Sequence, residues 1–461
     1  MPERDLFSNI SPLDHRYSLR EEERKRLEQY FSEEASIAYR LKVELALVET
    51  LAARGLCSQA VAGEVREAIK EIRAEEVYEE ERRTRHDIRA LVNTIKKRVS
   101  TEAHPWLHFT ATSMDIVETA RSLCFKEANQ ELVLPAVRGL LSTWIELARR
   151  ERDTLQIGRT HGQHALPITF GLALTSHLER LGERMERLEE TASRLPGRLA
   201  GAVGGFNAQS LFFDDPEAFE RDFLQRLGLE QARVKTQILP PEYQLDYLHA
   251  VVSAYGVLAN FSDDMRHLQR SEIEEVGEHF ARDQVGSSTM PHKRNPINYE
   301  NVKSMWKEFM PRIVTHYLDQ ISEHQRDLTN SASSRFIPEL ITGFVSSINR
   351  LQRVCKNFAV DRGAMERNLK QSRDMILAEP LYLLLAHAGH PDAHEAVRRL
   401  TLEAEEKKMG IMELLQEKED LQQYWSGMDE NQRAVLKDPA KYTGQAEEIV
   451  DRVTTYWEQK I

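Results

Sequence analysis

The sequence is poor in cysteine. Its 461 residues include three cysteines, Cys57, Cys124 and Cys355, which lie far apart and form no CxxC pair. An odd number of widely spaced thiols suggests neither a disulfide framework nor a zinc site. We interpret these residues as buried structural thiols, and a reducing compartment suits them.

Long apolar runs and an excess of basic residues are also lacking. Residues 1–5 show no basic region followed by an apolar one, so no secretory signal is visible, and no uncharged apolar run reaches membrane-spanning length. Lys and Arg number 62 against 74 Asp and Glu, a net charge of −12. Nucleic acids and anionic membranes both require a basic face. We therefore expect a cytoplasmic protein that binds neither, although a local basic pocket for a small anion stays open.

Glycine and proline are modest, at 21 and 16 residues, while Leu, Glu, Arg and Ala dominate. This bias favours helix over sheet. Apolar residues recur at helical spacing over 137–148, 174–188 and 245–265, and residues 298–355 suggest one or two further long helices. No segment alternates convincingly as a strand would. We predict an all-α protein whose long helices pack nearly parallel in a bundle and associate with other copies.

Three segments interrupt the helical pattern and are predicted to be loops. They are residues 158–167, the glycine-rich 201–207, and 283–296, which contains Gly286, serines and two prolines. The third segment offers hydroxyls, an ammonium, a guanidinium and an amide, so it could close over an anion. A polar surface loop is the plainer alternative. From about Asp361 the chain is denser in charge and suggests a smaller helical domain.

Three motifs resemble those of the fumarase/aspartase superfamily. Residues 286–296 read GSSTMPHKRNP and match its signature loop SSxMPxKxNP. Residues 160–167, THGQHALP, and 110–115, TATSMD, are similar to two further superfamily segments. Because many positions agree at fixed spacing and in the expected order, chance agreement is far rarer than for usual short motifs. The sequence is identified as a member of this superfamily.

Within the superfamily, the sequence resembles the adenylosuccinate lyase family. His292 stands where fumarases and aspartases usually have glycine and argininosuccinate lyases usually have glutamine. Carboxymuconate cycloisomerases share MPHKRNP, so other segments are needed to decide. Residues 11–17 (SPLDHRY), 84–87 (TRHD), 236–238 (TQI) and 325–331 (QRDLTNS) are similar to segments of adenylosuccinate lyases. The resemblance is least specific in the last hundred residues.

This resemblance implies both a reaction and an architecture. The reaction is β-elimination of fumarate from adenylosuccinate, giving AMP, and from succinylaminoimidazole carboxamide ribotide in purine nucleotide biosynthesis. The architecture is three helical domains: residues 1–113, residues 114–363 with the signature loop at 282–296, and residues 364–461. The central domain would contribute its long helices to a bundle in a homotetramer with shared active sites.

The resemblance also implies catalytic roles. Ser287 would take the proton, and Lys293, with Asn295 and nearby backbone amides, would stabilise the dianion that forms. A serine can act so only as an alkoxide, or nearly so, held by these groups in a dry site. His161 would protonate the leaving nitrogen, because histidine is well suited to proton donation near neutral pH. His86 would orient or assist His161.

The implied substrate carries two carboxylates and a phosphate, which the planar donor fork of arginine suits. By resemblance, Thr112 and Ser113 would bind a succinyl carboxylate, and Gln237 would contact either that carboxylate or the base. His108 would serve either packing or phosphate binding. For any single arginine, a solvated helix face is the alternative. The full implied substrate-binding set is Arg16, Tyr17, Arg85, Asp87, Thr112, Ser113, Gln237, Asn295, Arg326, Ser331 and Arg335.

No metal or cofactor is required, because lysine and amides supply the electrophilic stabilisation and no Asp and His residues cluster at ligand spacing. No phosphate-loop or dinucleotide fingerprint is present. One alternative is another superfamily activity, such as argininosuccinate lyase or carboxymuconate cycloisomerase. A second is a non-catalytic structural protein on the same fold, which the presence of Ser287, His161 and Lys293 disfavours. A coiled-coil scaffold would need sustained heptads, and the loops interrupt them.

Overall fold

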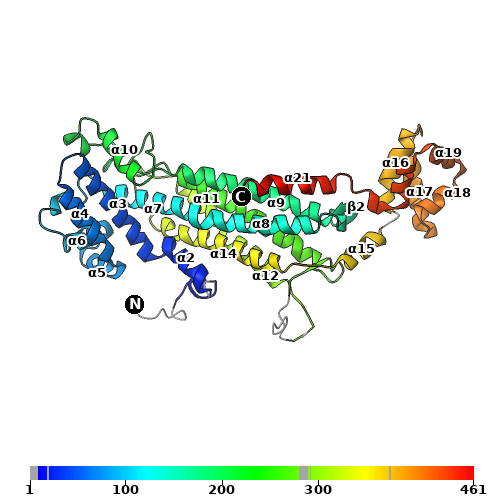
Figure 1. Cartoon of the computed structure of the whole chain (residues 1–461), viewed down its shortest axis with the longest axis horizontal. Coiled ribbons are helices and arrows are strands. Elements are labelled where there is room, and N and C mark those ends of the chain that lie inside the picture. The colour runs from blue at the N-terminus through cyan, green and yellow to red at the C-terminus, as the bar shows by residue number, and fades with distance from the viewer. Residues whose placement is uncertain (1–8, 18–19, 280–288, 291, 373–374) are drawn as a thin grey trace. The chain divides into compact units, whose positions relative to one another are not determined.

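The computed structural model describes residues 9–17, 20–279, 289–290, 292–372 and 375–461 (Figure 1). Helices dominate these residues, which confirms the all-α prediction. The chain divides into two units. Unit 1 comprises Met1–Arg138, Glu183–Leu258 and Ser304–Asn349, and unit 2 comprises Gly139–Gly182, Ala259–Lys303 and Arg350–Ile461. All five division points fall within helices.

The long helices follow the predicted apolar stripes. The stripes at 137–148, 174–188 and 245–265 correspond to α8 (Leu134–Arg150), α9 (Phe170–Ser193) and α11 (Glu242–Leu268). Leu140, Leu178 and Leu248 in these stripes are fully buried. Apolar burial at three- and four-residue spacing is the main source of stability for such helices.

Residues 298–355 differ from the prediction of one or two long helices. They form α12 (Ile297–Phe309), α13 (Arg312–Leu318) and α14 (Ile337–Lys356), with a 3₁₀ turn, η6 (Ser333–Phe336), before the last. Pro311 separates α12 from α13, because proline cannot donate the helical hydrogen bond and disfavours helix in the preceding residue. The segment between α13 and η6 contains the predicted substrate-binding stretch 325–331.

Nine helices lie wholly within the described part of unit 1, and five of them, α2, α4, α5, α7 and α10, pack against α3. Twelve side chains of α3 are buried, and Ser32 caps the helix by accepting from the amide of Ala35 at 3.1 Å. The nine are α1 (Pro12–His15), α2 (Glu21–Phe31), α3 (Glu33–Ala53), α4 (Gln59–Ala68), α5 (Ala74–Thr84), α6 (Asp87–Lys96), α7 (Ser113–Ala128), α10 (Pro216–Arg226) and α13.

Unit 2 contains a β-hairpin where the sequence predicted a loop, and that prediction was wrong. Strands β1 (Leu155–Thr160) and β2 (Gln163–Thr169) pair antiparallel, with Thr160 opposite Gln163. The register shifts between Ile157 and Arg159, on either side of Gly158. The hairpin was missed because its strands do not alternate apolar and polar residues, and its glycines and proline are typical of loops.

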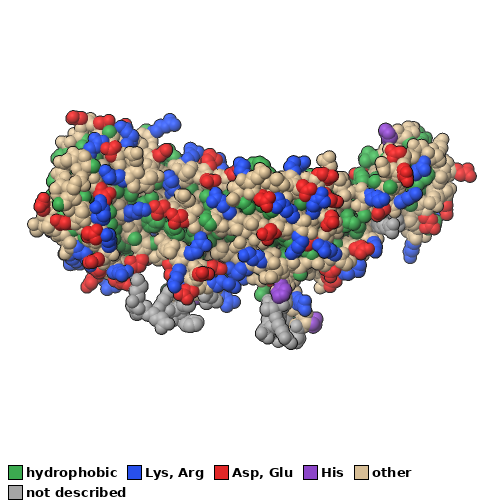
Figure 2. All heavy atoms as spheres, in the orientation of Figure 1, with side chains coloured by type: hydrophobic (Ala, Val, Ile, Leu, Met, Phe, Trp, Pro, Cys, Tyr) green, Lys and Arg blue, Asp and Glu red, His purple; other side chains and the backbone are tan. Residues whose placement is uncertain are grey.

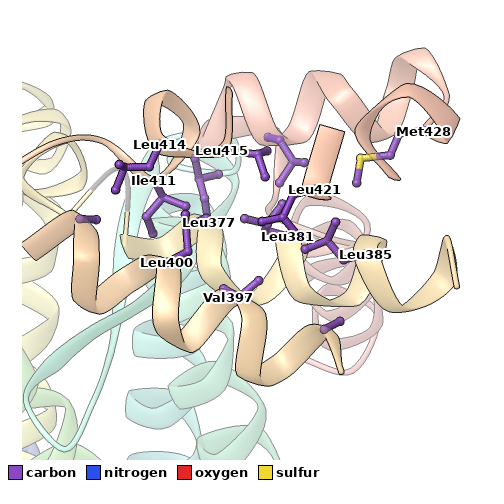
Figure 3. Close-up of a cluster of buried hydrophobic side chains, with 13 residues drawn as sticks. Leu377, Leu381, Leu385, Val397, Leu400, Ile411, Leu414, Leu415, Leu421 and Met428 are labelled. Carbon is purple, nitrogen blue, oxygen red and sulfur yellow. The ribbon is translucent and has the colours of Figure 1, made fainter. Parts of the chain in front are cut away.

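The C-terminal part of unit 2 is a cluster of short helices around a leucine-rich core. Leu381, Leu385, Ile411, Leu414 and neighbouring side chains point into this core (Figure 3). The helices are α16 (Ala378–His387), α17 (Ala393–Lys407), α18 (Ile411–Glu417), α19 (Glu419–Gly427) and α20 (Glu430–Lys437). The preceding helix, α15 (Arg362–Gln371), packs against β1 instead. A short strand pair, β3 (Val276–Gly277) with β4 (Ala359–Val360), precedes them.

The last helix, α21 (Ala446–Glu458), leaves that cluster and packs along α9 (Figure 1). Trp457 donates from its indole nitrogen to Glu179 at 2.8 Å, and a Cβ on Gly182 would lie 2.3 Å from the Trp457 ring. Arg149 binds both carboxylate oxygens of Glu458 at 2.6 and 2.8 Å. The close approach at Gly182 explains why a glycine lies inside a long helix.

The surface and the thiols agree with an ordinary globular protein. On the face drawn in Figure 2, acidic and basic side chains are interspersed. Among the described residues, no helix is both long and apolar enough to cross a membrane. Cys124 and Cys355 are buried and Cys57 is half-buried. Burial raises the pKa of Cys124 to about 12, which makes it unreactive as a nucleophile.

Candidate active site

His161 occupies the tip of the hairpin in unit 2. His161 and Gly162 have φ of 53° and 76°, and positive φ at both central residues is the pattern of the type I′ turn that suits two-residue hairpins. A histidine in this region is strained, whereas glycine is not. The His161 side chain is exposed, so its ring can reach a substrate or another molecule of the protein.

A buried carboxylate anchors the hairpin. Glu275 is fully buried and accepts hydrogen bonds from Arg159 at 2.6 and 3.1 Å, Gln156 at 2.8 Å and Asn368 at 2.8 Å. A buried charge is tolerated when its lone pairs are occupied in this way. Because two of the donors come from β1, Glu275 fixes the strand that leads to His161.

A second histidine of the motif, His164, is held differently. Its Nδ1 lies 2.6 Å from the hydroxyl of Ser372. Burial, with the nearby guanidinium of Arg159, lowers the pKa of His164. Its imidazole is therefore neutral near pH 7 and poorly suited to donate a proton, which favours His161 among the two histidines of this segment.

The signature loop is only partly visible. Ser287, with Gly286 and Ser288, lies outside the described residues. Of the described loop residues, Lys293 is exposed and Asn295 is half-buried.

The two ends of the signature loop are joined by Glu278. Its carboxylate accepts from the amides of Asn298 at 2.8 Å and Tyr299 at 3.2 Å, at the start of α12, and from the Asn298 side chain at 2.6 Å. The pKa of Glu278 is raised by burial, although these hydrogen bonds oppose the shift. Gln269 adds a second link by accepting from the Glu278 amide and donating to the Arg294 carbonyl. The helix after the loop thus starts from a fixed point.

The predicted residues Arg85, His86 and Asp87 form the junction between α5 and α6 in unit 1. Arg85 ends α5 with φ of 51°. His86 caps α6, its Nδ1 accepting from the Arg89 amide at 3.2 Å, while its side chain is 53% exposed. Because Nδ1 is an acceptor, the proton of the neutral ring lies on Nε2. His86 therefore serves as a helix cap in addition to its predicted catalytic role. Asp87 forms an ion pair with Arg40 at 3.3 Å.

His108 is paired with a carboxylate that the sequence analysis did not identify. Its Nδ1 lies 2.7 Å from Glu44, which is fully buried, and its backbone amide donates to the same carboxylate at 3.2 Å. Burial lowers the pKa of His108, but the Glu44 carboxylate outweighs it, and the net shift is upward. The available signal was Glu44 itself, a lone carboxylate inside the apolar run of α3.

Thr112 and Ser113 lie at the N-terminus of α7. Thr112 and Asp115 form a capping box, in which the Thr112 amide donates to Asp115 at 2.8 Å. Both Thr112 and Ser113 are half-buried. Amides and hydroxyls at a helix N-terminus suit a carboxylate ligand, as the predicted succinyl contact requires.

Two predicted substrate-binding residues contact each other directly. Arg326 donates from Nη1 to the Gln237 side-chain oxygen at 3.0 Å, and the Gln237 amide nitrogen donates to the Ala202 carbonyl at 2.9 Å. This contact joins the predicted segments 236–238 and 325–331 to the glycine-rich loop. Ser331 is half-buried, whereas Arg335, in η6, is exposed.

The remaining predicted residues are distributed between the units. Arg16 is exposed and Tyr17 half-buried just after α1, in unit 1 with the other predicted substrate-binding residues except Asn295. Unit 2 holds Asn295, His161 and Lys293. Within the described ranges, no group of three or more His, Cys, Asp or Glu residues is arranged to hold a metal ion.

Family models match nearly the whole chain. The model described as Lyase matches residues 11–310, and the model described as adenylosuccinate lyase C-terminal matches residues 322–442. The first covers more than half of the sequence, and the second covers the segment that contains Arg326, Ser331 and Arg335.

Individual relatives agree with the family models over the same length. The chain is 35% identical over 456 residues to the adenylosuccinate lyase of Pyrococcus abyssi, covering 98% of both chains. It is 31% identical over 451 residues to that of Archaeoglobus fulgidus, covering 97% of this chain and 98% of the other.

Solved structures show the same fold. The chain is similar to a fumarate lyase from Mesorhizobium sp. BNC1, with a TM-score of 0.82, 24% identity and coverage of 94% and 97% of the two chains. It is also similar to the 3-carboxy-cis,cis-muconate lactonizing enzyme of Pseudomonas putida, with a TM-score of 0.81, 23% identity and the same coverage. At these identities the likeness concerns fold alone. The full-length sequence matches decide the family: the chain belongs to the adenylosuccinate lyases of the fumarase/aspartase superfamily.

Proposed function

We propose that this protein releases fumarate from adenylosuccinate, giving AMP, and from succinylaminoimidazole carboxamide ribotide in purine nucleotide biosynthesis. The observation that carries the proposal is 35% identity to an adenylosuccinate lyase across 98% of both chains. The three free thiols suit the reducing cytoplasm, where we place the reaction.

The proposed reaction moves two protons, breaks a C–H and a C–N bond, and forms the double bond of fumarate. Ser287 removes a proton from the carbon beside a carboxylate, and the electron pair left there forms the double bond of fumarate as the C–N bond breaks. His161 gives a proton to the departing nitrogen. Lys293 and Asn295 stabilise the carbanion, which is a dianion with its neighbouring carboxylate. The exposed position of His161 at a strained turn supports its role, because such positions are frequent at functional sites.

Substrate recognition is proposed for unit 1. Thr112 and Ser113 at the start of α7 would bind one succinyl carboxylate, with Gln237 beside them. Arg326 lies within hydrogen-bond distance of Gln237, and Ser331 follows on the same segment. Together with Arg335, Arg16 and Tyr17, these residues offer the donors that a phosphate requires. Arg85 and Asp87 would flank His86, which would orient or assist His161.

An apolar face on α13 supports a homotetramer with shared active sites. This α13 face consists of Val314, Tyr317 and Leu318 on the helix, with Met310 just before it and Ile321 just after it. The five positions follow helical spacing, and Leu318 and Ile321 are 65% and 78% exposed. Exposed apolar side chains gathered in this way mark interaction surfaces. We propose that other copies of the chain cover this face, and that sites built from several copies bring residues of the two units together.

The proposed function is tested by incubating the purified protein separately with adenylosuccinate, argininosuccinate and 3-carboxy-cis,cis-muconate. Fumarate release is followed for the first two, and lactone formation for the third. We expect turnover of adenylosuccinate. Turnover of argininosuccinate or carboxymuconate without turnover of adenylosuccinate would overturn the proposal in favour of another superfamily activity.

A further inference from the structure

A fully buried ion pair is hydrogen-bonded to the backbone of the predicted carboxylate-binding segments. Arg198 and Asp115 are both 0% exposed, and Nη2 of the arginine lies 3.2 Å from Oδ1 of the aspartate. Neither residue belongs to the predicted substrate-binding set. Removing two charges from water is costly, so such a pair is stable only when further hydrogen bonds satisfy both groups.

Asp115 joins the start of α7 to the glycine-rich loop. Its two carboxylate oxygens accept from the amides of Thr112 at 2.8 Å, Ala200 at 3.0 Å and Gly201 at 3.2 Å. One side chain therefore sets the backbone of the predicted carboxylate-binding turn and the backbone of the loop that begins at Gly201.

Arg198 joins the same loop to the segment that contains Gln237. Its Nη2 donates to the carbonyls of Gly201 at 2.8 Å and Thr236 at 3.0 Å, and its Nη1 donates to the carbonyl of Gln237. The planar guanidinium can reach these carbonyls together, which an ammonium group cannot do with the same geometry.

The backbone of Arg198 is itself tied to α7. The hydroxyl of Thr119 donates to the Arg198 carbonyl at 3.0 Å and accepts from the Arg198 amide at 2.9 Å. The loop also packs tightly on the segment before Gln237, since Gly204 has φ of +80° and a Cβ there would lie 2.1 Å from the carbonyl oxygen of Lys235. These contacts leave little freedom for the three segments to move relative to one another.

We propose that Arg198 and Asp115 are positioning residues for the carboxylate-binding part of the site. They do not touch substrate. They hold the start of α7, the loop 201–207 and the segment 236–237 in one arrangement. The donors of Thr112, Ser113 and Gln237 are therefore oriented before a succinyl carboxylate binds. This inference rests on the proposed function. Preorganised donors matter because a misplacement of about 1 Å can cost roughly 100-fold in rate.

The test measures product inhibition in Arg198→Lys, using the full chain. Lysine keeps the charge beside Asp115 but cannot span the carbonyls of Gly201, Thr236 and Gln237. We expect the Ki of fumarate, which occupies the succinyl subsite, to rise about tenfold or more, by the loss of positioned hydrogen bonds. The Ki of AMP, which occupies the nucleotide subsite, should change less than about twofold. A purely structural role would lower stability and active fraction without altering the ratio of the two constants.

A matched control and a milder variant complete the design. Arg66 pairs with Glu49 between α4 and α3 and contacts none of the three segments, so Arg66→Lys should leave both inhibition constants unchanged. Thr119→Val is nearly isosteric and removes the two bonds to the Arg198 backbone, so it should show the same selective effect if Arg198→Lys does not fold. Equal changes in both constants, or no change with turnover intact, would overturn the inference. Absence of adenylosuccinate turnover in the unmodified protein would instead refute the proposed function.

Discussion

Three histidines in or beside the candidate site have different surroundings. His161 is exposed at a hairpin tip. His164 lies within hydrogen-bond distance of the Ser372 hydroxyl and has a lowered pKa. His108 is paired with buried Glu44 and has a raised pKa. Environment rather than residue type decides what an imidazole can do near neutral pH. The exposure of His161 agrees with the proposed proton donation, and the Glu44 carboxylate favours the charged form of His108.

Replacing the proposed acid should slow C–N cleavage. His161→Asn cannot protonate the leaving nitrogen, so kcat should fall about 10²–10⁴-fold, and the limb of the pH–rate profile that reports an imidazolium should vanish. Steady-state kinetics across pH measure both. His394 is exposed on α17, and His394→Asn should behave like the unmodified protein. A profile that retains this limb in His161→Asn would refute the assignment.

The pair between His108 and Glu44 should stabilise the fold in a pH-dependent way. The folded-state pKa of His108 is raised, so the stabilisation from its charge is complete below the ordinary value of 6.5 and disappears as pH rises through the raised value. His108→Gln should therefore cost about 3 kcal/mol near pH 6 and less near pH 9. Urea unfolding at both values measures the difference. An equal loss of unfolding free energy in His108→Gln at the two pH values would contradict the charged pairing.

Motif residues could be located from the sequence, but their buried partners could not. His161 and Arg326 stand in segments whose spacing is characteristic. Glu44 and Arg198 lie far from the residues they hold, at separations of 64 residues from His108 and 39 from Gln237. Only the folded chain brings such pairs together. The apolar run around Glu44 marks it as unusual, but no local pattern tells which residue it holds.

At the scale of elements, the hairpin and the start of α7 present the predicted groups. Helices were predictable because burial at three- and four-residue spacing leaves a clear pattern, as in α8 and α11. The hairpin was not, because its strands are short, are interrupted at Gly158 and alternate poorly. Within 298–355, Pro311 separates α12 from α13, and this local helix-breaking effect could have been predicted from the sequence.

The hairpin turn should matter more for catalysis than for stability. Gly162 has φ of +76° with open space around it, so Gly162→Val should cost only about 1–2 kcal/mol of backbone strain. Displacement of His161 should nevertheless lower kcat about tenfold or more. Gly228 has φ of +65° and equally open surroundings, so Gly228→Val is a matched control. Equal kcat values for the two variants would show that the turn does not position the acid.

At the scale of the whole molecule, the predicted residues belong to both units, and the proposed homotetramer would bring them together in shared sites. The family and the all-α class could be predicted from motifs and composition. The face of α13 that supports assembly could not, because exposure of Leu318 and Ile321 depends on how the neighbouring helices pack.

A charge on the α13 face should disrupt the oligomer. Leu318→Glu would bury an unpaired carboxylate at each contact, at a cost of about 3 kcal/mol or more, and smaller species should appear in analytical ultracentrifugation with loss of activity. Leu402 on α17 is 47% exposed, and Leu402→Glu should remain assembled and active. An unchanged sedimentation coefficient for Leu318→Glu would place the interface elsewhere.

The most direct measurement is the simultaneous release of fumarate and AMP from adenylosuccinate by the unmodified protein and by Ser287→Ala. We expect equal amounts of the two products from the unmodified protein, and a near-complete loss of turnover in Ser287→Ala with substrate affinity largely kept, because the variant lacks the base but retains the binding groups. Turnover by Ser287→Ala at the unmodified rate, or no fumarate from the unmodified protein, would contradict the proposed elimination.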